Sequence, residues 1–428
     1  MSLAFHIIFA AVGIGMPVLM TIAEGIYLRR GNPVYLELSR RWANGTAILF
    51  AVGAVSGTVL SFELGLLWPR FMEHAGAIIG MPFSLEGFAF FTEAIFLGVF
   101  LYGRNRIPPR AHWLAGLIVA GSGILSGIFV VTANAWMNTP VGFERVNGEF
   151  RNIDPIAAML NPAALHEVIH MTLAALAATG FLVAGIHAFF LLRDRASEFH
   201  RAACNIGAAL GCISIPLQVL SGDFAAHRVA ELQPAKLAAM EAHFATRRGV
   251  PLAIGGIVDE ERMTTRYALE IPNGLSLLLG SSVSTEVPGL DRVPRDQWPR
   301  VRAVHWSFDI MVGCGMCMLA IALWAGLGCW RKRPLAENKW LLRAFLIAAP
   351  MGIIAIEAGW LVTEFGRQPW VIYGIMRTSE AVTPMHGLVV PFTMFTAVYL
   401  FLSIILVFLL KRQFRETAPL QHEERHGA

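Results

Sequence analysis

Nine long apolar segments decide what this chain can fold into. A helix needs about 20 mostly apolar residues to cross the hydrocarbon layer of a membrane. Only 15% of the 428 residues are charged, whereas soluble proteins carry about 25%. The sequence therefore predicts an all-α, polytopic membrane protein with about nine transmembrane helices. We expect the spans at residues 3–27, 45–67, 84–103, 112–136, 163–192, 205–221, 305–329, 341–362 and 387–410.

The positions of the basic residues predict how these spans are oriented. Cytoplasmic loops of membrane proteins are enriched in Lys and Arg. Every second loop of this chain carries such a cluster, beginning with Arg29, Arg30, Arg40 and Arg41 and ending with Lys411 and Arg412. We therefore expect the N-terminus outside and the C-terminus in the cytoplasm. The sequence shows no basic face with interleaved aromatic residues, so nucleic acid is not an expected partner.

One long polar segment interrupts the apolar pattern. It covers residues 222–304 and, by the orientation above, lies on the outer side of the membrane. A loop of this length in a compact bundle is usually functional or disordered. The expected organisation is helices one to six over 1–221, the outer loop over 222–304, helices seven to nine over 305–412, and a cytoplasmic tail over 413–428.

The five cysteines all fall within or at the ends of apolar spans. Cys314 and Cys317 form a C-x-x-C motif, which can indicate redox chemistry or a metal site. The motif lies in mid-span and has no second pair of cysteines to complete a zinc site. We therefore interpret Cys204, Cys212, Cys314, Cys317 and Cys329 as small core residues without disulfides.

Four residues with metal-binding side chains are predicted to share one depth in the membrane. His6, His170, Met311 and Glu364 each lie within the outer third of a different span, as judged from 1.5 Å of rise per residue. Imidazole and thioether groups are axial ligands of haem iron, and a His/Met pair is a usual low-spin arrangement. His170 and Met311 could form such a pair, and His6 and Glu364 could each serve as a single ligand.

Each of these residues taken alone has a simpler interpretation. A single histidine is more often a hydrogen-bonded core residue than a ligand, and methionine often fills gaps in a core. Their occurrence together at one depth favours a haem-binding redox membrane protein.

Three acidic residues in the early spans suggest a path for protons. Glu86 and Glu93 are seven residues apart, so they share one face of the third span. Ionisable residues inside a membrane commonly belong to proton relays. Glu63 on the second span could extend the column. The alternative is that one or more of them lie at a span end and are solvated.

A short motif favours a different activity. His166-Glu167-Val168-Ile169-His170 matches H-E-x-x-H, in which two histidines on one helical face bind zinc and the Glu acts as a base. An intramembrane zinc metalloprotease that uses these residues is therefore the alternative function. No third ligand motif follows it.

Several ordered segments resemble subunit I of the cytochrome bd quinol oxidases across nearly the whole chain. The most specific is Glu357-Ala358-Gly359-Trp360 followed by Gly366-Arg367-Gln368-Pro369-Trp370. The other matching segments are Glu86-Gly87 through Glu93, Asn134-Ala135-Trp136-Met137-Asn138, Asn161-Pro162, Lys236-Leu237-Ala238-Ala239-Met240-Glu241 and Ile310-Met311-Val312-Gly313.

This resemblance implies a set of cofactors and roles. A low-spin haem b would bind His170 and Met311, and a high-spin haem b and a haem d would use His6 and Glu364, with the assignment between these two left open. Trp360 and Arg367 match residues beside haems, and Glu86 and Glu93 match the family's acidic pair. The segment 222–304 would bind quinol at Lys236 and Glu241.

The resemblance also implies an activity and a place in the cell. The chain would be a catalytic subunit of a respiratory terminal oxidase in the bacterial inner membrane. It would oxidise quinol at the outer face and reduce O2 to water, separating charge without pumping. A second membrane subunit would be its partner, and a small accessory subunit could join the two. No copper is expected, because three or more histidines do not cluster at suitable spacing.

Two further features concern the subclass. The outer loop is of the short kind, which resembles the cyanide-insensitive branch of the family. Asp309 stands where many members carry Arg. A carboxylate there would stabilise a positive haem iron instead of a propionate, so we expect an altered potential for the haem held by Met311.

Overall fold

A computed structural model describes residues 1–415, and its spans are all helical. Nine helical segments in this part of the chain are long and apolar enough to cross a membrane, which confirms the predicted fold class. They are α1 (Ser2–Arg30), α2 (Pro33–Leu67), α3 (Pro69–Tyr102), α4 (Pro109–Asn138), α6 (Ala164–Arg193), α7 (Glu198–Leu232), α10 (Val301–Trp330), the pair α11 (Lys339–Ala348) and α12 (Met351–Arg367), and α14 (Val389–Arg415). Most of the tail predicted over 413–428 lies outside the described residues.

Several helices extend beyond their apolar segments. Helix α7 continues past residue 221 to Leu232, and α2 begins at Pro33, where the side chain of Asn32 accepts a hydrogen bond from the amide of Val34. A helix can keep its backbone hydrogen bonds after it leaves the hydrocarbon layer, where the apolar signal ends. The outer segment between α7 and α10 is therefore shorter than the predicted 222–304.

The eighth span is broken, although the sequence analysis expected one continuous helix over 341–362. Helix α11 ends at Ala348 and α12 begins at Met351, and Pro350 lies between them. Proline lacks a backbone N–H and clashes with the preceding turn, so it interrupts a helix. The break faces α6, because a Cβ on Gly185 would lie 2.5 Å from the Ala349 Cβ. Close contact at Gly185 holds the two half-helices against the bundle.

The contacts within the described chain divide it into two units. The first contains Met1–Pro69, Phe88–Ile124 and the described residues from Thr383 onward, and the second contains Arg70–Gly87 and Leu125–Val382. Helices α3 and α4 contribute to both units. In the first unit, α14 packs on α2 and α1, where Phe9, Val52 and Tyr399 are buried together.

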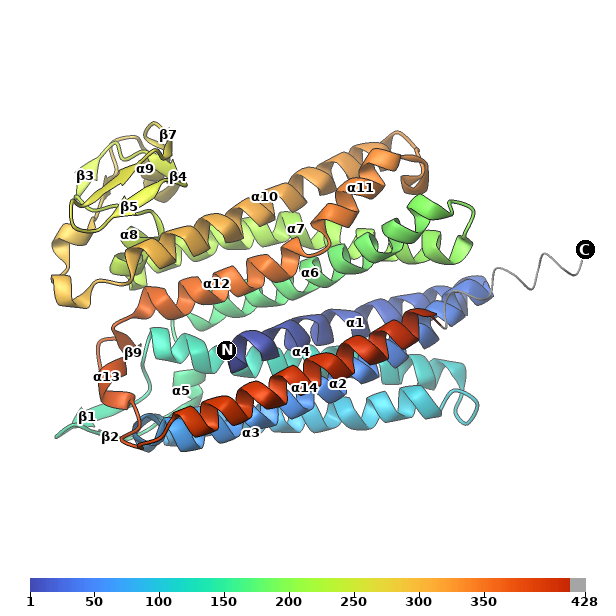
Figure 1. Ribbon diagram of the computed structural model, residues 1–428, viewed down its shortest axis with the longest axis horizontal. Helices are drawn as coiled ribbons and strands as arrows, with labels where there is room; N and C mark the ends of the chain where they lie inside the picture. The colour runs from blue at the N-terminus through green and yellow to red at the C-terminus, as the bar shows by residue number, and fades with distance from the viewer. Residues whose placement is uncertain (416–428) are drawn as a thin grey trace, which may run out of the picture. The chain divides into compact units, whose positions relative to one another are not determined.

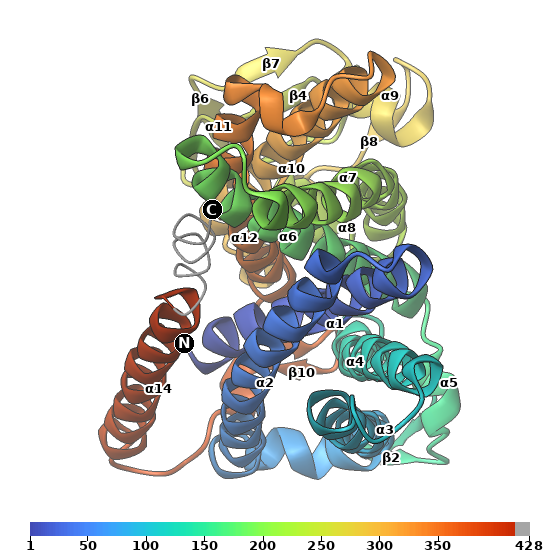
Figure 2. The ribbon, with the colours of Figure 1, turned by 90° about the vertical axis from the view of Figure 1, so that its right-hand side faces the viewer.

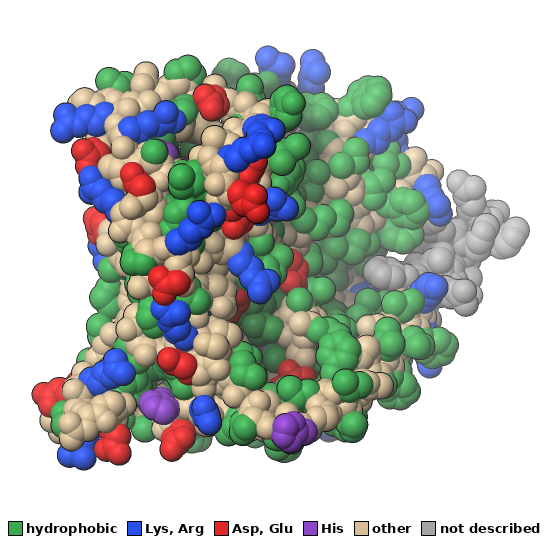
Figure 3. Space-filling model, turned by 60° about the vertical axis from the view of Figure 1, so that its left-hand side comes forward, with side chains coloured by type: hydrophobic (Ala, Val, Ile, Leu, Met, Phe, Trp, Pro, Cys, Tyr) green, Lys and Arg blue, Asp and Glu red, His purple; other side chains and the backbone are tan. Residues whose placement is uncertain are grey.

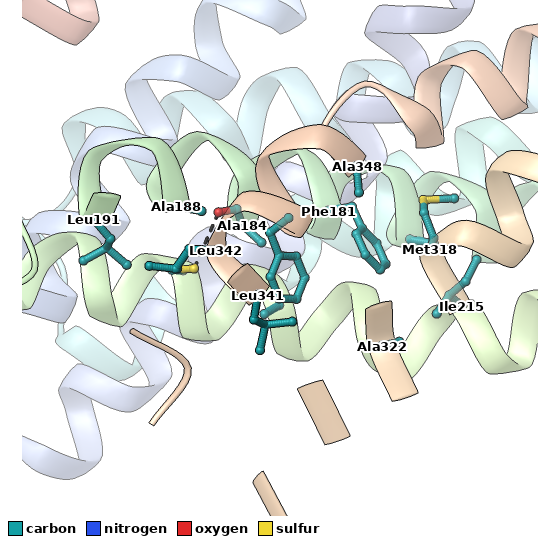
Figure 4. Packing of buried hydrophobic residues seen from close by; sticks show 14 of the residues in the cluster. Phe181, Ala184, Ala188, Leu191, Ile215, Met318, Ala322, Leu341, Leu342 and Ala348 are labelled. Carbon is teal, nitrogen blue, oxygen red and sulfur yellow. Dashed lines mark hydrogen bonds between the residues drawn. The ribbon is translucent and has the colours of Figure 1, made fainter. Parts of the chain in front are cut away.

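The second unit is built on α6, α7, α10, α11 and α12, which lie side by side in Figures 1 and 2. Their shared core contains Phe181, Ile215, Met318 and Phe345, and Figure 4 shows Phe181 pointing toward Met318 and Ile215 between the helices. Small residues let the helix backbones approach. The Cys204 thiol lies 3.5 Å from the backbone oxygen of Ala184, marked by the dashed line in Figure 4.

The loops of the second unit fold into short two-stranded antiparallel sheets. The pairs are β1 (Glu144–Val146) with β2 (Glu149–Arg151), β3 (Arg247–Arg248) with β8 (Glu286–Val287), β4 (Leu252–Ile254) with β7 (Leu269–Ile271), β5 (Ile257–Asp259) with β6 (Thr264–Arg266), and β9 (Trp370–Ile372) with β10 (Met376–Arg377). The remaining short helices are α5 (Pro155–Met159), α8 (Pro234–Met240), α9 (Gly274–Gly280) and α13 (Thr378–Ala381). Charged side chains gather over these loops, while hydrophobic side chains cover the flanks of the helices (Figure 3).

The cysteines depart in part from their predicted burial. Cys204 is buried, but Cys317 and Cys329 are exposed on the protein surface, so the interpretation of all five as core residues is wrong. A surface within the membrane is apolar, and a small cysteine is compatible with lipid on that side. All five are free thiols.

We predict that Gly180→Ala will destabilise the second unit. A Cβ at Gly180 would lie 2.3 Å from the backbone nitrogen of Gly211 on α7, so the two helices must separate. Overpacking of this kind costs about 1–3 kcal/mol. The denaturation temperature of the purified oxidase should fall. The control Gly326→Ala places a Cβ with nothing within 4 Å and should leave that temperature unchanged or slightly raised. Equal denaturation temperatures for the two variants would contradict this packing.

Candidate functional site

Met311 lies on α10 and its sulfur is directed at α12. A Cβ at Gly359 would lie 2.8 Å from Met311 Sδ, so only glycine at that position lets the thioether occupy its place. Trp360 follows Gly359 directly and is half-buried. Helices α10 and α12 pack along each other, and this pairing brings the two segments together.

His170 lies on α6 and is held by two residues of α7. Its Nδ1 lies 2.9 Å from Ser221 Oγ, and its Nε2 lies 3.0 Å from the side-chain nitrogen of Gln218. A Cβ at Gly222 would be in van der Waals contact with the ring, 3.5 Å from Cε1. Since the Gln218 amide donates to Nε2, that nitrogen carries a lone pair, and the Nδ1 proton points to Ser221. Gln218 Oε1 is buried and has no hydrogen-bond partner among the described residues.

Glu364 and Arg367 form an ion pair in the last turn of α12. Arg367 Nη2 donates to Glu364 Oε2 at 2.8 Å, and Asn134 of α4 donates to Glu364 Oε1 at 3.2 Å. The Arg367 side chain is only 1% exposed. Its Nε and Nη1 atoms are buried without any partner in residues 1–415. The guanidinium therefore has unused donors that could bind a further anionic group.

A buried polar network surrounds Asn138 at the end of α4. Lys236 of α8 donates to Asn138 Oδ1 at 2.8 Å, and Gln233 donates to the Asn138 backbone oxygen at 2.9 Å. Asn138 Nδ2 in turn donates to Glu167 Oε1 at 3.1 Å and to Asn134 Oδ1 at 3.1 Å. Asn134 thus connects this network to Glu364.

Lys236 is the buried cation of this network. Burial lowers the pKa of Lys236, and the carboxylates of Glu167 and Glu364 partly offset that change. A Cβ at Gly366 would lie 2.7 Å from Lys236 Cγ, so the lysine stem crosses α12 in close contact. Lys236 is therefore attached to the Glu364–Arg367 turn by packing as well as by charge.

Glu241, the second predicted quinol residue, belongs to a different cluster. Burial, with a smaller contribution from the Asp309 carboxylate, raises the pKa of Glu241 to about 8. His305 is fully buried nearby, with Nδ1 2.7 Å from the Met240 backbone oxygen and Nε2 2.9 Å from the Gly255 backbone oxygen. These bonds attach the outer segment to α10.

Asp309 is part of the same attachment. Its Oδ2 atom accepts the Gly255 amide at 2.8 Å and lies 3.3 Å from His305 Nε2. The carboxylate therefore holds the link between β4 and β5 of the outer segment on α10. This contact gives Asp309 a structural role that the sequence did not reveal.

His6 lies near the start of α1, in the first unit. Its Nδ1 is 2.9 Å from Ser56 Oγ of α2, and Ser56 itself donates to the Gly53 backbone oxygen at 3.0 Å. A Cβ at Gly57 would lie 3.1 Å from the His6 ring, so α2 needs a small residue beside it. A ligating histidine usually donates its other N–H to an oxygen, which is the arrangement at Ser56.

The three acidic candidates for a proton route have different neighbours. Glu86 Oε1 accepts a hydrogen bond from Ser126 of α4 at 3.4 Å. Glu93 is buried, and its carboxylate lies within 3.3 Å of the position that a Cβ at Gly123 of α4 would occupy. Glu86 and Glu93 therefore both lie toward α4. Glu63 instead accepts a hydrogen bond from Ser2 of α1 at 2.6 Å.

The H-E-x-x-H segment does not form a zinc site in the described chain. His166 Nδ1 is buried and has no hydrogen-bond partner among residues 1–415. Glu167 is hydrogen-bonded to Asn138. Groups of three or more His, Cys, Asp or Glu side chains arranged to hold a metal ion are absent from residues 1–415.

The donor sets fit haem. His6 has one ring nitrogen bonded to a serine and the other directed away from it, and His170 presents a lone pair that accepts from the Gln218 amide. Met311 presents a thioether against a glycine. The free buried N–H groups of Arg367 suit a propionate carboxylate, which arginine binds with two parallel hydrogen bonds. Imidazole, thioether and carboxylate are all able to bind haem iron.

Sequence reasoning missed the residues that orient these groups. Ser56, Ser221, Gln218 and His305 were not predicted to take part. Gln218 and His305 carried a usable signal, because a polar side chain in or beside an apolar span is costly unless it has a partner. Serine is common in membrane helices and gave no such signal.

A multi-pass helical bundle that presents these groups near its helix ends defines a haem-binding redox membrane protein. A model of the cytochrome bd terminal oxidase subunit I family matches residues 1–418. The chain belongs to the cytochrome bd terminal oxidase subunit I family.

Relatives support this membership over the full length. The chain is 37% identical over 422 residues to the putative cytochrome bd menaquinol oxidase subunit I of Bacillus subtilis (strain 168), covering 97% of this chain and 94% of that protein. It is 33% identical over 438 residues to the cytochrome bd ubiquinol oxidase subunit 1 of the same organism, covering 99% and 92%. Among solved structures, that of the bd oxidase from Geobacillus thermodenitrificans matches with a TM-score of 0.92 and 38% identity, covering 97% of this chain and 96% of that chain.

The chain is therefore a haem-containing subunit of a quinol oxidase, a respiratory terminal oxidase that transfers electrons from quinol to O2. It is a multi-pass protein of the bacterial inner membrane and works with a second membrane subunit. The metalloprotease alternative has no support.

We predict that Gly359→Ala will displace the Met311 thioether and disturb any haem that this sulfur holds. The added methyl would lie 2.8 Å from Met311 Sδ, so the thioether must move. Reduced-minus-oxidised spectra of the purified oxidase should show a shifted or weakened low-spin band. Gly315→Ala on α10 is the control, because its methyl meets nothing within 4 Å. Identical spectra for the two variants would place the sulfur away from the iron.

Proposed function

We propose that His170 and Met311 hold a low-spin haem b, and that His6 and Glu364 hold a high-spin haem b and a haem d. Which of His6 and Glu364 serves haem d is left open. No copper takes part. When bound, the haems supply one-electron transfer and an iron at which oxygen is reduced. The observation that carries this assignment is the pair of buried, unpartnered donors on Arg367, one turn from Glu364.

Arg367 and Trp360 position the cofactors. Arg367 neutralises Glu364 on one side and offers Nε and Nη1 to propionates on the other. Trp360 follows Gly359, which contacts Met311, and would help to line the haem that Met311 holds. Ser56 and Ser221 each contact Nδ1 of the His6 and His170 rings, so the opposite nitrogen of each ring would be the one to hold iron.

Quinol is bound by the outer segment between α7 and α10, with Lys236 and Glu241 beside the quinol ring. Lys236 is held by Asn138, and Glu241 is buried directly after the same short helix, beside the attachment made by His305. A buried lysine that is ready to lose its charge can donate a hydrogen bond to a quinol oxygen. Glu241 in its carboxylate form can accept a quinol proton and release it to the outer water.

Protons for water formation enter from the cytoplasm through Glu93 and Glu86, and Glu63 extends this set. Glu93 and Glu86 both face α4, which supports their use as successive stations. Because quinol protons leave on the outer side and consumed protons enter from the inner side, charge is separated without a pump.

The N-terminus of the chain lies on the outer side of the membrane and the C-terminus on the cytoplasmic side. A small accessory subunit can join the second membrane subunit.

We predict that Met311→Leu will abolish or shift the low-spin haem signal. Leucine keeps the volume of the side chain but offers no sulfur to iron. Reduced-minus-oxidised spectra of the intact oxidase measure this directly. Met316→Leu, an exposed methionine on the same helix, is the matched control and should leave the spectrum unchanged. An unchanged Met311→Leu spectrum would reject the ligand assignment.

We predict that quinol oxidation will accelerate as pH rises through about 8, because the pKa of Glu241 is raised to about 8 and only its carboxylate accepts a proton. Glu241→Gln should remove this rising limb from the pH profile of quinol-driven oxygen consumption. Glu270→Gln changes an exposed carboxylate of the same segment and should keep the limb. A rising limb that persists in Glu241→Gln would show that another group accepts the proton.

A further inference from the structure

A buried glutamate–histidine pair joins four elements of the first unit. Glu24 of α1 is 2% exposed and His112 of α4 is 1% exposed. Glu24 Oε1 lies 2.6 Å from His112 Nδ1, and His112 Nε2 lies 2.7 Å from the backbone oxygen of Phe100 on α3. Ser39 of α2 donates to Glu24 Oε2 at 3.2 Å. None of these residues belongs to the site described above.

The partners of His112 determine how many protons the pair holds. The Phe100 carbonyl can only accept, so Nε2 must carry a hydrogen. The short bond between Glu24 and Nδ1 also needs one hydrogen, which belongs either to the imidazole or to the carboxyl group. The pair therefore stores one proton that can lie on either partner.

The pair lies just below the surface that the charge pattern places in the cytoplasm. Arg104, in the turn between α3 and α4, has Nη2 3.5 Å from Glu24 Oε2, and its side chain is 17% exposed. Arg40 and Tyr27 are the other charged or titratable groups that influence Arg104. The Arg104 side chain therefore lies between the stored proton and the water on the cytoplasmic side.

The other side of the pair leads toward Glu93. Phe100 and Glu93 are seven residues apart, so they share one face of α3. On α4, His112 contacts Phe100 and Gly123 lies beside Glu93, so the interval between them on this helix spans about 16.5 Å at 1.5 Å per residue. Figure 2 shows α3 and α4 close to end on, with α1 and α2 inclined to the view.

One unpartnered hydroxyl lies within that interval. Thr21 Oγ1 is buried, on a residue 4% exposed, and it has no hydrogen-bond partner within residues 1–415. A Cβ at Gly116, one turn beyond His112, would lie 2.8 Å from this oxygen. Thr21 is also one turn from Glu24 on α1. A buried hydroxyl without a partner is unfavourable unless water reaches it.

We propose that the Glu24–His112 pair loads protons from the cytoplasmic side and passes them through Thr21 and ordered water to Glu93. This inference rests on the proposed role of Glu93. The stored proton moves toward the Thr21 hydroxyl, which accepts one proton and donates its own. A proton from the inner water then replaces it on the pair. No electron is exchanged, and Arg104 holds Glu24 in place.

Thr21→Val gives the sharpest test. The hydroxyl has no partner among the described residues, so its replacement by an isosteric methyl should not lower the denaturation temperature or the haem content. We expect quinol-driven oxygen consumption and membrane-potential generation in liposomes to slow at least five-fold. Exchange of the Glu93 carboxyl band in D2O, measured by infrared spectroscopy on the resting oxidase, should slow as well. Unchanged turnover and unchanged exchange would overturn the proposal.

Glu24→Gln tests the pair itself. The amide keeps the shape and can still donate to His112, but it cannot carry a proton, so at least a ten-fold slowing is expected. Glu37→Gln is the matched control, because Glu37 is more exposed and pairs with Arg41 one helical turn away. If Glu24→Gln fails to fold, Thr21→Val decides alone.

Glu93→Gln separates this inference from the proposed function. Suppose that turnover is slow in Glu93→Gln but normal in Thr21→Val and Glu24→Gln. This result would keep the proton route through Glu93 and reject proton loading by the Glu24–His112 pair. Normal turnover in Glu93→Gln would reject the proposed route itself. Anaerobic reduction of the haems by quinol should stay normal in all of these variants.

Discussion

The compensation of buried charge is the constraint on which this structure depends. Removing one partner from a buried ion pair costs about 3–5 kcal/mol, because an uncompensated charge remains. The second unit meets this requirement by connecting Glu364, Arg367, Glu167 and Lys236 through Asn134 and Asn138. Of these four residues, only Arg367 has buried side-chain nitrogens that lack any partner within residues 1–415, and an anionic group could pair with them.

Close helix contacts at glycine hold these groups in place. Gly359 admits the Met311 sulfur, Gly57 admits the His6 ring, and Gly366 admits the stem of Lys236. In each case a Cβ would contact a side chain to which we assign a role in binding haem or quinol. The polar groups are thus positioned by backbones that approach closely, which a membrane bundle achieves with small residues.

The fold was largely predictable because hydrophobic length alone identifies a membrane span. The nine spans follow from it, whereas the end of α7 does not, because a helix can continue after its apolar segment ends. The break at Pro350 was readable from the proline but was not predicted.

The candidate site could be predicted only in part. His6, His170, Met311 and Glu364 could be selected because such side chains are costly in hydrocarbon. Their partners could not, because Ser56 and Ser221 lie on other helices, and the rotation of one helix against another is not written in a local pattern. Glu24 and His112 are also ionisable side chains that are costly to place in hydrocarbon, yet nothing in the sequence indicated that they contact each other.

The central claim is that separate helices bring these side chains to haem iron. A density map of the intact oxidase with its second membrane subunit and bound haems tests it most directly. The account predicts one iron bonded to both His170 Nε2 and Met311 Sδ, with the Gln218 amide displaced, and further irons at His6 and Glu364. A map in which the Gln218 amide still donates its hydrogen bond to His170 Nε2, with iron bound elsewhere, would contradict the account.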